Sequence, residues 1–309
     1  MSTYFNNDNN IFNANLLDTP DYVRDFLDYE EAVLGRAPST LRCYYLSIDL
    51  FIRYLIGRET KEKFEDIETV SFPIEKMKKV EKTDIEAFLS YCEKKRKNGP
   101  EGLHSKLAAL KAFFKYCCSV TGIFDMDPTM DVSFPERQSS KLKVLTDKDI
   151  ERVKKASKYG LSPERNNCIV LLLLNYGLRL TELTALNVDD INEDVLKVGQ
   201  GDRMRELKID KDTLNALNSW LKARESYFLR TDKALFVGIQ KGTRMTGRSV
   251  EKVLNNVFAA AGIEYKGYNA NALRQTAATK MGQKEDVDAE ELMKTLGNIT
   301  TKKIKQYIQ

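Results

Sequence analysis

The chain has 309 residues, of which 42% are hydrophobic and 30% charged, the balance of a folded globular protein rather than a disordered one. This length is enough for two domains that each bury a core. The net charge of +4 permits binding to a polyanion without requiring it, and no apolar run approaches the roughly 18 residues of a membrane span. We therefore expect no association with a membrane.

The first 18 residues are polar and rich in asparagine, without the basic and then apolar pattern of a secretion signal. We expect residues 1–18 to be disordered. The five cysteines are odd in number and lack Cys-x-x-Cys spacing, so they are expected to be reduced thiols in a cytoplasmic protein. His104 is the only histidine, which argues against a zinc site.

The first half of the chain has helical periodicity. Apolar residues recur at steps of three and four, and breakers such as Gly35 and the Asn98-Gly99-Pro100 turn separate the periodic stretches. The pattern predicts helices over residues 21–34, 38–56, 83–97 and 101–120. The charged segment 57–82 contains Pro73 and is expected to be a loop or a short irregular element. With no strand signal, these four helices predict a small helical bundle.

A polar segment after Phe134-Pro135 separates this bundle from the second half of the chain. We predict a first domain over residues 19–138, a linker over 139–145 and a second domain over 146–309.

The second domain is predicted to be mainly helical with a small β element. Polar and apolar residues alternate on both sides of Gly199-Gln200-Gly201-Asp202, which predicts a β-hairpin over 194–209. Residues 234–237 predict a further short strand. Helices are predicted over 146–159, 165–176, 211–229, 246–261, 269–283, 287–296 and 299–308.

Two arginines and a tyrosine of this domain could carry chemistry. Arg179 directly follows a buried helix, and Glu182 stands three residues later, where it could orient the guanidinium. Arg274 lies inside a helical pattern, and Tyr307 lies in the last predicted helix. Arginine is suited to bidentate binding of phosphate. On residue type alone, Arg179 could also be a surface residue at a helix cap, and Tyr307 a packing residue.

Four motifs, taken together, resemble those of the tyrosine recombinases, the family of phage integrases and Xer-type resolvases. They are GLRLTEL around Arg179, the hairpin VGQGDRMRELKI, ALRQTAAT around Arg274, and LGN followed after nine residues by Tyr307. Each motif alone is weak, but four in the same order and spacing form a specific signal. The resemblance covers residues 20–309. It implies a mainly α fold with a small β-sheet: an N-terminal four-helix, SAM-like core-binding domain plus an α+β catalytic domain.

The resemblance also implies an activity, site-specific recombination or integration of DNA. Tyr307 would attack a DNA phosphate and form a 3′-phosphotyrosyl link, while Arg179 and Arg274 would hold the non-bridging oxygens. No cofactor is implied, because the protein–DNA bond keeps the phosphodiester energy and two guanidiniums take the place of a metal. The implied partners are double-stranded DNA and further copies of the chain, which would form a tetramer on DNA.

The chain departs from the family pattern at the positions that transfer protons. The hairpin lysine of the family is Gln200 here, and Asn271, Gln275 and Asn298 stand where histidine (or tryptophan, for Asn298) is usual. Amides bind phosphate but do not exchange protons near pH 7. Loss of a general acid or base costs about 10²–10⁴-fold in rate. The alternative is therefore a DNA-binding relative with weak or no cleavage activity.

Basic side chains near these motifs are candidate DNA contacts, because neutralising phosphates drives salt-dependent binding. Four basic residues in and beside the hairpin could replace the missing lysine, or could only contact DNA backbone or solvent. They are Lys197, Arg203, Arg205 and Lys208. In the helical half the candidates are Arg42, Lys106 and Lys111, which could equally belong to a solvated face.

Overall fold

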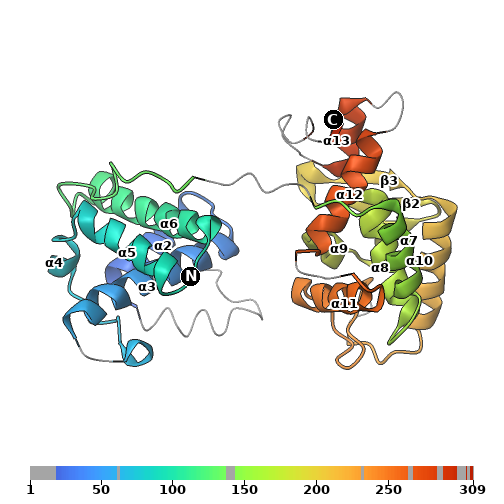
Figure 1. The fold of residues 1–309 in the computed structure, drawn as a ribbon, viewed down its shortest axis with the longest axis horizontal. Coiled ribbons are helices and arrows are strands. Elements are labelled where there is room, and N and C mark those ends of the chain that lie inside the picture. The colour runs from blue at the N-terminus through green and yellow to red at the C-terminus, as the bar shows by residue number, and fades with distance from the viewer. Residues whose placement is uncertain are drawn as a thin grey trace. The chain divides into compact units, whose positions relative to one another are not determined.

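A computed structural model describes residues 19–60, 63–136, 143–230, 233–263, 267–283, 288–297, 304, 307 and 308. The segment 1–18 and most of the helix predicted over 299–308 lie outside the described residues. Contacts between residues divide the chain into two compact units, Met1–Ser139 and Ser140–Gln309 (Figure 1). None of the helices described is both long and apolar enough to cross a membrane.

The first unit is a bundle of helices. Its elements are α2 (Asp21–Ala32), α3 (Pro38–Glu59), the 3₁₀ turn η1 (Phe64–Asp66), the short α4 (Ile74–Met77), α5 (Lys82–Lys94) and α6 (Pro100–Ser119). Pro38 and Pro100 begin their helices, where a missing N–H costs no helical hydrogen bond. The four long helices are those that the periodicity predicts, so the predicted helical bundle is confirmed.

Aromatic side chains fill the centre of this bundle. Phe26, Phe51, Phe88, Phe113 and Phe114 are fully buried. Several meet edge to face, such as Phe51 and Phe88, whose ring centroids lie 5.1 Å apart at 67°. Edge-to-face contacts add to the free energy gained by burying the rings. The bundle therefore has its own core, as the length of the chain allows.

The second unit is built around one buried helix, α8 (Pro163–Tyr176), in which every side chain from Cys168 to Leu174 is buried. This helix packs against α7, α10 and α12 (Figure 1). The helices around it are α7 (Asp147–Ser157), α9 (Leu180–Ala185), α10 (Lys211–Arg224), α11 (Gly247–Ala260), α12 (Ala270–Gly282) and α13 (Ala289–Leu296).

A three-stranded antiparallel sheet completes the unit, in the order β1 (Ile191–Asn192), β2 (Val195–Val198), β3 (Arg205–Lys208). β2 and β3 form the predicted hairpin, with Val198 opposite Arg205, and a 3₁₀ turn, η3 (Gly201–Arg203), follows its tip. Burial alternates along β3, so Arg205 and Leu207 face inward. The predicted mainly α fold with a small sheet is confirmed.

Two of the differences from the sequence predictions lie in the second unit. Residues 234–237 do not form a strand of the sheet: Ala234 and Val237 make single antiparallel bridges, to Asn187 and Arg244. The partners lie in irregular segments, so no ladder can extend from them. Helix α10 ends at Arg224 instead of residue 229, because the chain turns there, with Tyr227 N donating to Arg224 O at 3.1 Å.

Candidate active site

Arg179 stands at a sharp corner between α8 and α9. Helix α8 ends at Gly177, whose φ of 59° lies in the left-handed region that glycine adopts without strain. A Cβ at Gly177 would lie 2.7 Å from the Leu296 side chain, so the corner also packs tightly against the end of α13. Arg179 is the residue before the first turn of α9.

Glu182 holds Arg179 in two ways. Its Oε2 accepts from the Arg179 backbone N and its Oε1 from Arg179 Nη1, both at 2.7 Å. This is the orienting contact that the three-residue spacing suggests. The Arg179 guanidinium also donates to Gly297 O through Nη2 and reaches Leu296 O at 3.5 Å through Nη1.

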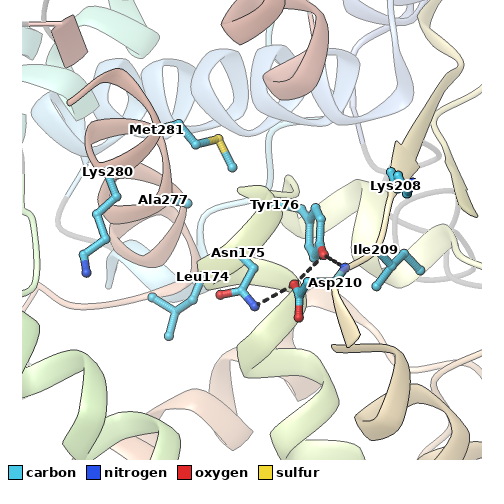
Figure 2. A pocket seen from close by; sticks show the side chains of 9 residues that line it. All are labelled: Leu174, Asn175, Tyr176, Lys208, Ile209, Asp210, Ala277, Lys280 and Met281. Carbon is cyan, nitrogen blue, oxygen red and sulfur yellow. Dashed lines mark hydrogen bonds between the residues drawn. The ribbon is translucent and has the colours of Figure 1, made fainter. Parts of the chain in front are cut away.

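The corner is also fixed to the end of the hairpin. Tyr176 Oη donates to Asp210 Oδ2 at 2.5 Å and accepts from Asp210 N at 2.6 Å, and Asn175 Nδ2 donates to the same carboxylate at 3.2 Å (Figure 2). Asp210 also caps α10 by accepting from Thr213 N at 2.9 Å. An open pocket of about 560 Å³ lies beside these groups, bounded on its far side by Met281 of α12. These bonds fix the strand β3 relative to Arg179.

Arg274 reaches the same place from α12. The Asn269 side chain caps this helix, accepting from Ala272 N at 3.0 Å. Arg274 is buried, donates to Gly177 O through Nη1, and donates to Leu296 O through Nη2 at 2.7 Å. The structure therefore brings Arg179 and Arg274 together at one shared carbonyl, that of Leu296.

Charges are concentrated around Glu182. Burial lowers the pKa of Arg274 to about 10, and the positive charges of Arg179 and Arg205 act in the same direction, against the effect of Glu182. Burial acts to raise the pKa of Glu182, but hydrogen bonds from Arg205 and Arg179 outweigh it and hold that pKa below its usual value. Glu182 is therefore an ionised carboxylate among cationic side chains.

Arg205 is the member of this cluster that sequence reasoning placed elsewhere. Its Nη1 and Nη2 donate to the two oxygens of Glu182 at 2.9 and 3.1 Å, and its Nε donates to Thr295 O at 2.8 Å. Its side chain is only 5% exposed, so its interpretation as a substitute lysine or a DNA or solvent contact is wrong. The hairpin alternation contained the signal, because Arg205 shares a face with Leu207 and Ile209.

The other basic residues of the hairpin are on its surface. Lys197 and Lys208 are exposed and face Glu206 and Asp194 at 3.9 and 3.8 Å. Arg203 is exposed in the turn η3. Their positions agree with either solvent or DNA as their surroundings.

Tyr307 lies in a small apolar cluster beside α12 and α13. It is 7% exposed, and it packs with Ala278, Leu292, Leu296 and Ile304. A Cβ at Gly282 would lie 2.4 Å from Tyr307 O, so this glycine lets the backbone segments approach closely. Burial raises the pKa of Tyr307, and the nearby positive charge of Arg274 opposes that rise. The phenol is therefore protonated at neutral pH.

The amides at the proton-transfer positions have different environments. Gln200 is exposed at the hairpin tip, and Asn271 is exposed in the first turn of α12. Gln275 Oε1 accepts from Lys143 N at 2.9 Å, beside a bond from Leu145 N to Thr276. Gln275 thus holds the end of the predicted linker against α12. Asn298 lies outside the described residues.

The basic candidates of the first unit also separate. Arg42 is exposed on α3, and Lys106 is half-buried on α6. Lys111 donates to Thr129 O and lies 5.5 Å from the centre of the Phe134 ring. These contacts tie Lys111 to the loop after α6, and its role as a DNA contact stays a prediction. His104 stacks on the same ring at 4.3 Å.

The cluster can bind and stabilise a phosphoryl group. Guanidiniums held in place give a preorganised cationic site for charge that develops in a transition state. A tyrosine within the field of Arg274 can act as a nucleophile once it loses its proton.

Comparisons with known proteins agree with this chemistry. Residues 143–309 match the phage integrase family, and residues 24–121 match the N-terminal SAM-like domain of phage integrases. The chain is 32% identical over 298 residues to the tyrosine recombinase XerC of Caldanaerobacter subterraneus subsp. tengcongensis, covering 94% of this chain and 83% of that protein.

Two solved structures share the fold. The XerH site-specific recombinase bound to difH substrate, a pre-cleavage complex, has a TM-score of 0.69 and 19% identity, over 95% of this chain and 94% of that one. A lambda integrase tetramer bound to a Holliday junction has a TM-score of 0.68 and 15% identity, over 96% of this chain and 80% of that one.

Proposed function

The chain belongs to the phage integrase family, the tyrosine recombinases, and from this premise we propose that it is a site-specific DNA recombinase that cleaves and rejoins strands through Tyr307. The observation that carries the assignment of residues is the convergence of Arg179 and Arg274 on the carbonyl of Leu296, next to the cluster that contains Tyr307. The alternative is a relative that binds DNA without cleaving it. The similar proteins reported above do not support it, because they are named as recombinases or integrases.

In the proposed reaction, Tyr307 Oη forms a bond to the phosphorus of the scissile phosphodiester while the bond from phosphorus to the 5′ oxygen breaks. The Tyr307 proton passes to solvent, and the leaving 5′ oxygen takes up a proton to become a hydroxyl. The 3′-phosphotyrosyl bond retains the phosphodiester energy, so attack by another 5′-hydroxyl reverses the step and joins the strands without a further energy source.

Arg179 and Arg274 are proposed to bind the two non-bridging oxygens and to stabilise the extra charge of the transition state. A guanidinium has five N–H donors. In the described part of the chain Arg274 uses two of them for Gly177 O and Leu296 O, which leaves donors for a phosphate oxygen. Glu182 fixes the Arg179 guanidinium by accepting from its Nη1 at 2.7 Å.

We propose that cleavage by this chain is slow, because its hairpin carries an amide where the family has lysine. Gln200 is exposed at the tip and cannot give a proton to the leaving oxygen near pH 7. The exposed lysines Lys197 and Lys208 face carboxylates across about 4 Å. Water is therefore proposed as the proton donor, at a cost of about 10²–10⁴-fold.

Double-stranded DNA and a tetramer on that DNA are the proposed partners, as in the lambda integrase tetramer bound to a Holliday junction. Residues 19–138 are proposed as the core-binding domain and 146–309 as the catalytic domain, joined by 139–145. Exposed Arg42 and half-buried Lys106 remain candidate phosphate contacts. The cytoplasmic location stays a prediction.

The test is covalent capture of DNA. Duplexes enriched for binding from a randomised pool are nicked near each candidate cleavage position, so that the short 5′-hydroxyl strand diffuses away and the adduct accumulates. We expect an adduct that survives denaturation with the wild-type chain and disappears with Tyr307→Phe. The matched control Tyr159→Phe removes an exposed hydroxyl and should keep the adduct. Binding of DNA without an adduct, or an adduct with Tyr307→Phe, would overturn the assignment.

A further inference from the structure

The carboxylate of Glu182 is shared unequally by three arginines. Each of its oxygens accepts two hydrogen bonds, one from Arg179 and one from Arg205. Arg274 Nη1 comes only within 3.9 Å of Oε2. The arrangement pairs Glu182 fully with Arg205 and leaves Arg274 outside direct hydrogen-bond distance.

Arg205 cannot itself reach DNA from this position. Its forked donors hold Glu182, its Nε holds Thr295 O, and only 5% of its side chain is exposed. Gly297 closes the remaining side, since a Cβ there would lie 2.7 Å from Arg205 Nη1. A role of Arg205 in the reaction must therefore pass through a neighbouring group.

We propose that Arg205 is a positioning residue that neutralises the charge of Glu182. The neutralised carboxylate still orients Arg179, but it does not draw the guanidiniums of Arg179 and Arg274 away from the phosphate. The inference rests on the proposed function and gives Arg205 a role different from the ones that the sequence suggested.

The physical reason is the balance of charge in a site of low polarity. Three guanidiniums around one carboxylate leave a net charge of +2. Without Arg205 the net charge is +1, and the carboxylate, which is only 11% exposed, faces Arg179 and Arg274 alone. A buried carboxylate that loses its partner interacts more strongly with the nearest cations. It would draw both guanidiniums toward itself and compete with the phosphate.

Lysine at position 205 would not do the same work. An ammonium is a point charge that cannot donate to both oxygens of Glu182 and to Thr295 O in one plane, whereas the guanidinium fork does so. We expect Arg205→Lys to be intermediate between the wild-type chain and Arg205→Ala.

The test is a double-mutant cycle on the trapping duplex, with Arg205→Ala, Glu182→Gln and the double variant. Arg205→Ala is expected to lower the rate constant for adduct formation about 10–100-fold, the loss typical of groups that support a ligand-binding side chain. DNA affinity should change less than about threefold, because binding is spread over many phosphate contacts. The double variant is expected to recover at least about tenfold over Arg205→Ala, because no unpaired carboxylate remains.

If Arg205 has only a structural role, the opposite result is expected. If Arg205 only joined β3 to α13, removing Glu182 as well would leave the double variant as slow as Arg205→Ala or slower, and that outcome would overturn the proposal. The matched control is Arg244→Ala, because Arg244 joins segments of the same unit by donating to Thr184 O and Leu186 O at 2.9 and 2.8 Å. Glu182→Gln should not recover any loss of activity in Arg244→Ala.

Circular dichroism shows whether Arg205→Ala folds. The cycle remains decisive if it does not. The double variant and Glu182→Gln are then compared, and the proposal expects their rates to agree within about threefold. A further tenfold loss in the double variant contradicts it.

If the wild-type chain forms no adduct, the proposed function fails instead. Nuclear magnetic resonance of the arginine side chains then decides on Arg205: Arg205→Ala must shift the Arg179 and Arg274 signals, and unchanged signals overturn the proposal.

Discussion

Two positions at the tip of one β-hairpin differ in what they contribute to the site. At the first residue of β3, Arg205 is buried and joins Glu182 to Thr295 O. Five residues earlier, at the tip, Gln200 is exposed to solvent. We propose that the buried position supports phosphate binding, and the exposed position is where the family resemblance implies a proton donor. We therefore expect phosphate binding and proton transfer to be separable in this chain.

This separation follows from the physical demands of each task. Holding a phosphate needs charge and fixed geometry, which a buried network of guanidiniums and carbonyls supplies. Proton transfer needs a group of suitable pKa at the leaving oxygen, which an amide cannot provide at any position.

The largest loss is expected on the buried side. Arg274→Ala removes a donor to the transition-state phosphate, and we expect adduct formation to slow about 10²–10³-fold. Lys280→Ala is the matched control, because Lys280 is exposed on the same helix and pairs with Asp147 at the surface. Equal rates in Arg274→Ala and in the wild-type chain would show that the buried cluster is not the phosphate site.

The largest gain is expected on the exposed side. Gln200→Lys places an ammonium at the hairpin tip, where it can protonate the leaving oxygen, and adduct formation should accelerate about 10²-fold. Gln240→Lys makes the same chemical change at another exposed turn and controls for added DNA attraction. If the two variants respond alike, position 200 does not carry the leaving-group role here.

The pH dependence of cleavage tests whether a base near Tyr307 has been overlooked. Burial raises the pKa of Tyr307 and Arg274 opposes this, so the ionised fraction rises about tenfold per pH unit below that pKa. We expect the rate constant for adduct formation to follow it between about pH 7 and pH 9.

The pH dependence of stability has to be worked out separately from the pH dependence of the cleavage rate. A raised tyrosine pKa in the folded state contributes stability below the unfolded pKa and loses it as pH rises through the folded pKa. Tyr307 therefore adds no loss of stability in the pH 7 to pH 9 window, and thermal unfolding at each pH checks this. A rate constant independent of pH across the window would instead indicate a general base that is already deprotonated below pH 7.

The smallest effect is expected at Gln275, where the resemblance has a histidine but the structure shows a bond to Lys143 N. Gln275→Ala should cost about 0.5–1.5 kcal/mol of stability and change the cleavage rate less than about threefold. Gln283→Ala, an exposed glutamine just after α12, is the control for the substitution itself. A loss of cleavage beyond tenfold at unchanged stability would mean that the amide itself acts on the phosphate.

Some of the fold could be predicted from local signals. Helical periodicity predicts the four long helices of the first unit, and alternation around Gly199 and Gly201 predicts the hairpin. The prediction of a strand over residues 234–237 is wrong because these residues have the composition of a strand but, in the part of the chain that the structure describes, lack neighbouring strands to pair with. They make only single bridges to Asn187 and Arg244. The end of α10 depended in the same way on a turn.

Motifs and residue types are sufficient to identify Arg179, Arg274 and Tyr307 as the candidate catalytic residues, and the spacing from Arg179 identifies Glu182. The three-dimensional packing was needed to show that Arg205 belongs to this cluster and that the carbonyls of Thr295, Leu296 and Gly297 accept from its arginines. It was also needed to show that Gln275 accepts from Lys143 N in the predicted linker. The reason is physical: periodicity records which face of a strand is buried, whereas the partner of a buried charge comes from segments distant in the chain.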